Sequence, residues 1–134
     1  LSDQYHDWNI RGFELTKSDD DPRKNALHLD CCLSIMSDGH AIFHPAGLKQ
    51  ECDRNFIRQT FDGKLLEVDA NQMYDMQCNL ISITSKDVVS CPTFQDVNDQ
   101  LQAWGYDVHT TILQETAKME GLLRCVTLPL MRQV

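Results

Sequence analysis

The chain has 134 residues, a formal net charge of −8 at pH 7, 42% hydrophobic residues and 24% charged residues. These values fit one globular domain and exclude a wholly disordered, collagen-like or coiled-coil chain. No apolar run approaches the roughly 20 residues of a membrane span, so we expect no membrane partner. Because phosphate binding needs a basic surface, the acidic balance also argues against a nucleic-acid partner and fits a small cation better.

The first elements predicted along the chain are short strands and loops. Residues 12–16 predict a strand, and the acidic run at 18–22 is typical of a solvated loop. Residues 29–36 are rich in apolar side chains and predict a second strand, which ends at a turn carrying Gly39. Residues 41–44 then return as the other strand of a hairpin.

A helix and a further strand are expected to complete this first unit. Leu48, Cys52 and Phe56 recur at a spacing of four residues, which indicates a helix with one apolar face. Residues 65–68 predict the closing strand. The unit therefore covers about residues 24–68 and has the order strand–strand–helix–strand.

The second unit repeats this order with clearer signals. Residues 78–84 predict a strand, residues 88–91 predict its hairpin partner, and Pro92 suits the first position of a helix. Gly105 is placed to end that helix, and residues 106–112 predict the closing strand. The helix carries an apolar stripe on one face, formed by Phe94, Val97, Leu101 and Trp104.

Three cysteines mark an internal repeat. Cys31, Cys78 and Cys125 are spaced evenly, 47 residues apart. The second unit covers about residues 76–113, and a third unit would begin with a last strand at 123–130. Because repeat units cannot bury their faces alone, we expect further units or a partner chain to pack against this single domain.

The cysteine pattern indicates free thiols. None of the six cysteines forms a Cys-x-x-Cys pair, which argues against a zinc ribbon or a thioredoxin-like redox site. We therefore expect neither a metal nor a cofactor. Free, mostly buried thiols are typical of a reducing compartment, so we expect a cytoplasmic protein.

His28, Asp30 and Cys125 are candidates for chemistry. If His28 and Asp30 lie on a strand, they share one face, where an imidazole can act as general acid and base. A water-facing pair on an edge strand is the alternative reading, just as a lone apolar-strand cysteine is usually inert. The repeat also aligns Cys125 with Cys31 rather than with Asp30, so a slip or bulge would be needed to bring them together.

Two segments resemble a known superfamily. Residues 27–30 read LHLD before an apolar strand, and residues 121–130 read GLLRCVTLPL. In this order they resemble the guanidino-group-modifying enzymes, which include arginine deiminases, dimethylarginine dimethylaminohydrolases and amidinotransferases. The resemblance implies an α/β fold, a five-fold (pentein-like) propeller of strand–strand–helix–strand units, of which this chain would be the C-terminal part.

The resemblance also implies roles for four residues. Cys125 matches the nucleophile that attacks the guanidinium carbon and forms a covalent thiouronium-type intermediate. His28 matches the residue that protonates the leaving amine and then activates the incoming water or amine. Asp30 matches a substrate-binding carboxylate that pairs with the guanidinium nitrogens, and Asn79 matches a position that lines the substrate site.

The implied function is a cysteine-dependent hydrolase acting on the guanidino group of arginine or an arginine derivative. An amidinotransferase, which passes the amidino group to an amine, is the first alternative. A non-catalytic fragment or interaction module is the second. A Cys–His acyl hydrolase is disfavoured, because no helix N-terminus precedes Cys125. Since such a propeller needs five units, the implied partners are a guanidino small molecule and either the missing N-terminal half or another chain, including a homodimer.

Overall fold

Two sheets of the same topology form the framework of the protein. The computed structural model describes residues 9–119, 121–128 and 130. In each sheet the first two strands pair antiparallel and the last two pair parallel. The first sheet contains β1 (Leu33–Ile35), β2 (Ala41–Phe43) and β3 (Leu65–Glu67). The second contains β4 (Ile81–Ser82), β5 (Asp87–Ser90) and β6 (Asp107–Thr110).

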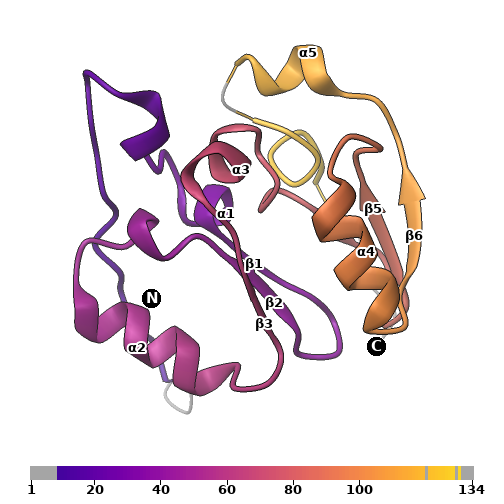
Figure 1. The fold of residues 1–134 in the computed structure, drawn as a ribbon, viewed down its shortest axis with the longest axis horizontal. Helices are drawn as coiled ribbons and strands as arrows, with labels where there is room; N and C mark the ends of the chain where they lie inside the picture. Colours follow the sequence, from indigo (N-terminus) through magenta and orange to yellow (C-terminus); the bar gives the residue numbers. More distant parts are fainter. Residues whose placement is uncertain (1–8, 120, 129, 131–134) are drawn as a thin grey trace.

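The helices connect and flank these strands (Figure 1). A parallel pair needs a crossover, which α2 (Glu51–Thr60) supplies in the first half and α4 (Gln95–Ala103) in the second. The remaining helices are short: η2 (Pro22–Lys24), α1 (Leu29–Cys32), η3 (Pro45–Gly47), α3 (Ala70–Tyr74) and α5 (Gln114–Ala117). Among the described residues, no helix has the length and apolar character that crossing a membrane requires.

The mixed α/β class and the strand–strand–helix–strand order of both predicted units are confirmed. Gly105 ends the α4 region with a φ of +89°, the left-handed conformation that favours glycine at a helix end. The predicted stripe of α4 is also confirmed, because Phe94, Val97 and Leu101 are buried.

Three strand predictions were wrong. The first four residues of the strand expected at 29–36 form the helical turn α1. The last strand expected at 123–130 is absent from residues 123–128 and 130, and residue 129 lies outside the described residues. A turn at 123–126 takes its place, in which the Val126 N–H donates to the Leu122 carbonyl at 3.0 Å. At 12–16 a single bridge between Leu15 and Leu48 takes the place of a strand.

The three cysteines of the 47-residue repeat therefore lie in turns and not in strands. The first strand of each sheet comes a few residues after such a turn. Cys31 lies in α1, Cys78 lies in the turn after α3, and Cys125 lies in the turn at 123–126. Each cysteine precedes a short apolar segment, and local alternation alone does not separate such a segment from a strand. Because a helical turn advances the chain less than a strand does, the side chains around each cysteine point differently from the prediction.

The predicted apolar face of α2 was wrong. Leu48 is buried but precedes the helix, Cys52 is exposed, and Phe56 keeps 37% of its surface accessible. The buried side chains of α2 are those of Asp53 and Ile57. The buried position before Ile57 is Asp53, whose carboxylate accepts a 2.7 Å hydrogen bond from Arg11. The Arg11 guanidinium lies 4.1 Å from the centre of the Phe56 ring. This ion pair and cation–π contact hold the N-terminal segment against α2.

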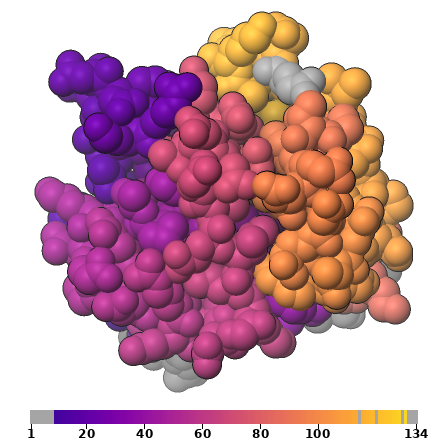
Figure 2. All heavy atoms as spheres, viewed as in Figure 1, coloured from indigo at the N-terminus to yellow at the C-terminus, as the bar shows by residue number. Residues whose placement is uncertain are grey.

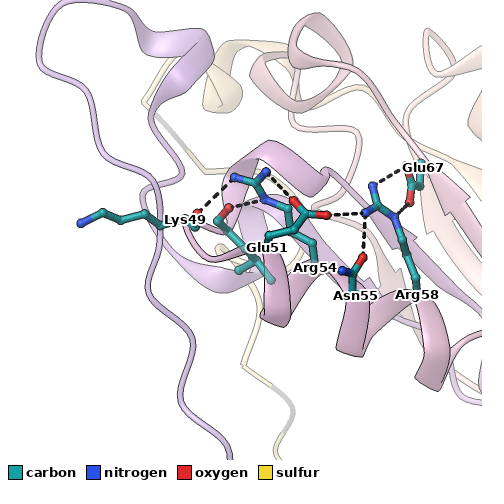
Figure 3. Close-up of polar contacts among 7 residues, drawn as sticks. Lys49, Glu51, Arg54, Asn55, Arg58 and Glu67 are labelled. Carbon is teal, nitrogen blue, oxygen red and sulfur yellow. Dashed lines mark hydrogen bonds and ion pairs between the residues drawn. The ribbon is translucent and has the colours of Figure 1, made fainter.

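The outer face of α2 carries a charged network (Figure 3). Glu51 accepts hydrogen bonds from Arg54 and Arg58, and Arg58 also donates to Glu67 of β3 at 2.7 Å. Exposed ion pairs of this kind each contribute little to stability, about 0–1 kcal/mol. The network keeps this face of α2 in contact with solvent.

The protein has two hydrophobic cores. The larger one joins the half of the chain that contains β1–β3 to the half that contains β4–β6. It includes Met36 and Ile42 of the first half and Leu80, Val88 and Leu101 of the second. The smaller core belongs to the first half and is formed by Ala26, Cys32, Leu33, Ala41, Phe43, Leu48, Ile57 and Met73. Seen as spheres, the two halves form one continuous surface (Figure 2).

Polar contacts also cross between the halves. Ser37, in the turn after β1, bonds Ser82 of β4 with 2.7 Å between the hydroxyl oxygens. His40 of the same turn stacks on Trp104 with ring centres 4.4 Å apart, and Tyr106 donates to Asp38. The first hairpin turn is therefore fixed to the end of α4.

Gly47 is expected to be intolerant of a side chain. A Cβ atom at this position would lie 2.5 Å from the Cys32 Cβ, so the η3 and α1 backbones would have to separate. We expect Gly47→Ala to lower the free energy of unfolding by about 1–3 kcal/mol, the usual cost of overpacking. Urea unfolding measures this change. Gly12→Ala is the matched control, because nothing lies within 4 Å of its added Cβ; equal effects of both substitutions would contradict the prediction.

Candidate active site

Asn79 is the centre of the candidate site. Its side chain is fully buried, and its Oδ1 accepts hydrogen bonds from the backbone N–H groups of Leu122, Arg124 and Cys125 at 3.0–3.2 Å. Its Nδ2 donates to the Asp30 carbonyl and to the Cys125 Sγ, both at 3.1 Å. One side chain thus fixes α1 to the C-terminal turn. A direct contact of Asn79 with substrate stays a prediction.

His28 and Asp30 are brought together by a helical turn. His28 is the N-cap of α1, and Asp30 follows in its first turn, where a carboxylate interacts favourably with the helix N-terminus. One donor atom each from His28, Asp30 and Cys31 lies within 4.8 Å of the others. The expected strand is absent here, but the imidazole and the carboxylate still lie close together. His28 is exposed, so its ring is accessible to a ligand.

The Asp30 carboxylate lies between two thiols. Its Oδ2 is 3.7 Å from the Cys125 Sγ, and its Oδ1 is 4.0 Å from the Cys31 Sγ. Cys125 is exposed, whereas Cys31 is buried. Because Cys125 lies in a turn, it reaches Asp30 without the register slip that a strand would have needed. The structure therefore brings Cys125 and Asp30 into contact, with His28 beside Asp30.

A cavity of about 430 Å³ opens beside Asp30. Its lining combines the Asp30 carboxylate and Arg124 with apolar side chains of the first strand of each sheet, among them Ile35 and Ile81. A concave, mostly apolar space with a few charged groups is typical of a small-molecule site. Sequence reasoning did not assign a role to Arg124, although it directly precedes the candidate nucleophile.

The same cluster offers donors for a metal ion. His28, Asp30 and Cys31 provide an imidazole, a carboxylate and a thiol, which are groups that Zn²⁺ accepts. A structural zinc site has four such ligands. The expectation that the protein uses no metal therefore stays a prediction.

Burial raises the pKa of three cysteines near the site. Desolvation is the largest cause for each of them, and it raises the pKa of Cys31 to about 11 and that of Cys32 to about 12. Burial also raises the pKa of Cys78 well above its usual value. These thiols are therefore almost entirely protonated in the folded protein at neutral pH, and they react slowly.

Stability is expected to fall at alkaline pH. An unfolded thiol titrates near pH 8.5–9, while the folded thiols titrate at about 11 and 12, so the unfolded chain loses protons first. The stabilising difference is complete below about pH 9. It is lost above that pH at up to about 1.4 kcal/mol per pH unit for each thiol. Urea unfolding at pH 7.5, 9 and 10.5 measures the loss. Cys32→Ala should flatten the decline, and a decline as steep as that of the unmodified chain would contradict this cause.

Comparison with known proteins confirms the class that the two sequence segments indicated, the guanidino-group-modifying superfamily. The profile of the family described as "N,N dimethylarginine dimethylhydrolase, eukaryotic" matches residues 5–132. The chain belongs to this family.

Two curated relatives are considerably longer than this chain. The uncharacterized protein YkgA of Bacillus subtilis (strain 168) is 32% identical over 106 residues, which cover 79% of this chain and 36% of YkgA. An arginine deiminase of Listeria welshimeri is 25% identical over 141 residues, which cover 82% of this chain and 35% of that enzyme. The chain thus spans about a third of the length of the curated relatives it matches.

A solved structure shares the fold. The N-terminal domain of ArgZ bound to product, described as an arginine dihydrolase from the ornithine–ammonia cycle in cyanobacteria, aligns with a TM-score of 0.78 and 20% identity. The alignment covers 95% of this chain and 44% of that chain. Nearly the whole of this chain therefore shares its fold with less than half of that longer chain.

Proposed function

We propose that this chain carries the nucleophile, the proton-transfer group and one binding carboxylate of a hydrolase that acts on the guanidino group of arginine or a methylated arginine. The observation that carries the proposal is the contact of the Cys125 Sγ with both the Asp30 carboxylate and the Asn79 amide, at 3.7 and 3.1 Å. Membership of the dimethylarginine dimethylhydrolase family supports the substrate class.

The first half of the reaction forms a bond to sulfur. Asp30 pairs with the planar cation through charge-assisted hydrogen bonds and holds its carbon against Cys125. The bound cation also favours the thiolate, which attacks the guanidinium carbon. His28 donates a proton to the departing nitrogen, the C–N bond breaks, and the amine leaves. The product of this half is a thiouronium attached to Cys125.

The second half releases the enzyme. His28, now neutral, accepts a proton from a water molecule as its oxygen attacks the thiouronium carbon. The C–S bond breaks, and the sulfur leaves as a thiolate. The substrate retains a ureido group in place of its guanidino group. The N–H of the Asn79 amide, directed at the sulfur, stabilises the negative charge on Cys125 at both ends of the cycle.

The proposed assembly is a five-fold propeller to which this chain contributes two units and a C-terminal turn. The coverage of about a third of the curated relatives supports a larger whole. The remaining units would come from another segment or another chain, and they would supply the groups that bind the rest of the amino acid. All six cysteines are free, which fits the cytoplasm as the proposed location.

The test is a product assay with two substrates. The chain is incubated with dimethylarginine and with arginine, alone and together with the N-terminal half of a relative, and dimethylamine, ammonia and ureido product are measured. We expect stoichiometric release of amine and ureido product. Formation of an amidino-amine only when an amine acceptor is added would identify an amidinotransferase instead. No product in any arm, with the fold intact, would identify a non-catalytic module.

A further inference from the structure

We propose that Cys31 and Cys125 form a reversible disulfide when the protein meets hydrogen peroxide, and that this bond switches the site off. The chemistry of the bond depends only on the two thiols. Its effect on activity rests on the proposed function of Cys125.

The two cysteines lie 95 residues apart in the sequence but meet at one carboxylate. The two oxygens of Asp30 contact the two sulfurs, at 3.7 Å for Cys125 and 4.0 Å for Cys31. Burial is the main cause of the raised pKa of Cys31, and the nearby Cys125 adds to it. Both sulfurs therefore lie at one carboxylate group, within 4.0 Å of its two oxygens.

The backbones that would be joined are already fixed to each other. Asn79 bonds the Asp30 carbonyl through its Nδ2 and the Cys125 N–H through its Oδ1. Asp30 directly precedes Cys31 in α1. A disulfide would therefore connect two segments that the fold holds together, and it would need little movement of the main chain.

The two thiols differ in the way that a reactive and a resolving cysteine differ. Cys125 is exposed and accepts an N–H donor at its sulfur, so peroxide reaches it first. Cys31 retains 3% of its surface accessible, and burial raises its pKa to about 11. Cys31 is thereby protected from direct oxidation, and its attack on an oxidised neighbour is slow because little thiolate is present.

The steps balance with peroxide as the only oxidant. The Cys125 thiolate attacks one peroxide oxygen, the O–O bond breaks, and protonation gives a sulfenic acid and one water. The Cys31 sulfur then attacks the sulfenic sulfur, the S–O bond breaks, and the hydroxide leaves with the Cys31 proton as a second water. Two thiols are oxidised by two electrons in total, and one peroxide is reduced to two waters. A dithiol reverses the change by exchange.

The adjacent Cys32 is excluded as the partner by its orientation. Its Sγ donates to the Leu29 carbonyl at 3.4 Å, and a Cβ built on Gly47 would lie 2.9 Å from that sulfur. Cys32 therefore faces η3 and the smaller core, away from Asp30. This difference between neighbouring residues gives the proposal a matched control.

Peptide mapping tests the bond without any assay of activity. The folded chain is treated with a few equivalents of hydrogen peroxide, remaining thiols are alkylated, and the tryptic digest is analysed by mass spectrometry. We expect a dithiol-sensitive link between residues 25–49, which contain Cys31 and Cys32, and residues 125–132. Fragmentation between residues 31 and 32 assigns the linked sulfur. Cys32→Ala should keep the link and Cys31→Ala should lose it.

Activity provides the second measurement. In the unmodified chain, peroxide should remove at least about nine-tenths of the turnover, and dithiothreitol should restore it. In Cys31→Ala, measured against its own untreated sample, the loss should be irreversible, because the sulfenic acid of Cys125 then has no thiol to capture it and oxidises further. A link to Cys32, or Cys125 found only as sulfinic acid in the unmodified chain, would overturn the proposal. A correct link in a chain that shows no product in any arm of the product assay, with or without the N-terminal half of a relative, would overturn the proposed function alone.

Discussion

Cys125→Ser should leave the fold intact and reduce turnover of guanidino substrates by about a thousandfold or more. A hydroxyl is a far poorer nucleophile than a thiolate, and the Asp30 carboxylate, 3.7 Å from the sulfur, is a weak base. Because Cys125 is exposed and serine can still accept the Asn79 N–H, stability should change little. The measurements are kcat/KM for the amine-releasing reaction and the thermal unfolding midpoint of each variant.

Two further variants separate chemistry from structure. Cys52→Ser changes an exposed thiol on α2, far from the site in the sequence, and should keep normal turnover. His28→Ala should lose nearly as much turnover as Cys125→Ser, because neither proton transfer then has a donor or acceptor. Turnover by Cys125→Ser within tenfold of the unmodified chain would reject covalent catalysis by this residue.

Asn79→Ala is expected to have the largest effect on stability. The substitution removes five hydrogen bonds and leaves three backbone N–H groups at Leu122, Arg124 and Cys125 without their acceptor. An unsatisfied buried polar group costs about 1–3 kcal/mol, so the free energy of unfolding should fall by roughly 3 kcal/mol or more. Urea unfolding gives the global value, and hydrogen exchange at these three amides shows whether the turn is released from α1.

Asn98→Ala is the matched control for this experiment. Asn98 is also a buried asparagine. Among the described residues its side chain makes one hydrogen bond, from Nδ2 to the Cys91 carbonyl at 2.9 Å, and its Oδ1 has no partner. Asn98→Ala should therefore lower the free energy of unfolding by about 1 kcal/mol, the usual contribution of a single hydrogen bond. Similar losses for the two variants would show that the hydrogen bonds of Asn79 are not what holds the turn.

Local patterns were sufficient to predict the two sheets. These patterns are the turn residues, the alternating apolar residues and the apolar stripe of α4. Each of them spans about ten residues, so it can be recognised without knowledge of distant contacts. Gly105 illustrates this, since its left-handed backbone follows directly from the need to end a helix. The repeat of Cys31, Cys78 and Cys125 then indicated that the same order occurs twice.

The residues of the candidate site could be proposed from the sequence, but the local structure that brings them together could not. His28, Asp30 and Cys125 were identified from short segments, yet all three were assigned to strands, because a four-residue apolar turn and a short strand have similar sequences. The structural role of Asn79 depends on contacts with residues more than 40 positions away. The one available signal was a polar side chain between Cys78 and Leu80, both of which are buried.

The shared core determines how the two halves respond to damage. Proteins built from repeats often lose their units one at a time, because each unit contacts only its neighbours. Here Ile42 and Leu80 belong to one cluster, and His40 stacks on Trp104 across the boundary between the units. Separating the halves would expose that cluster on both sides, so we expect the two halves to unfold together. A proteolytic cut between them is therefore expected to destabilise both halves and to mark the whole chain for degradation.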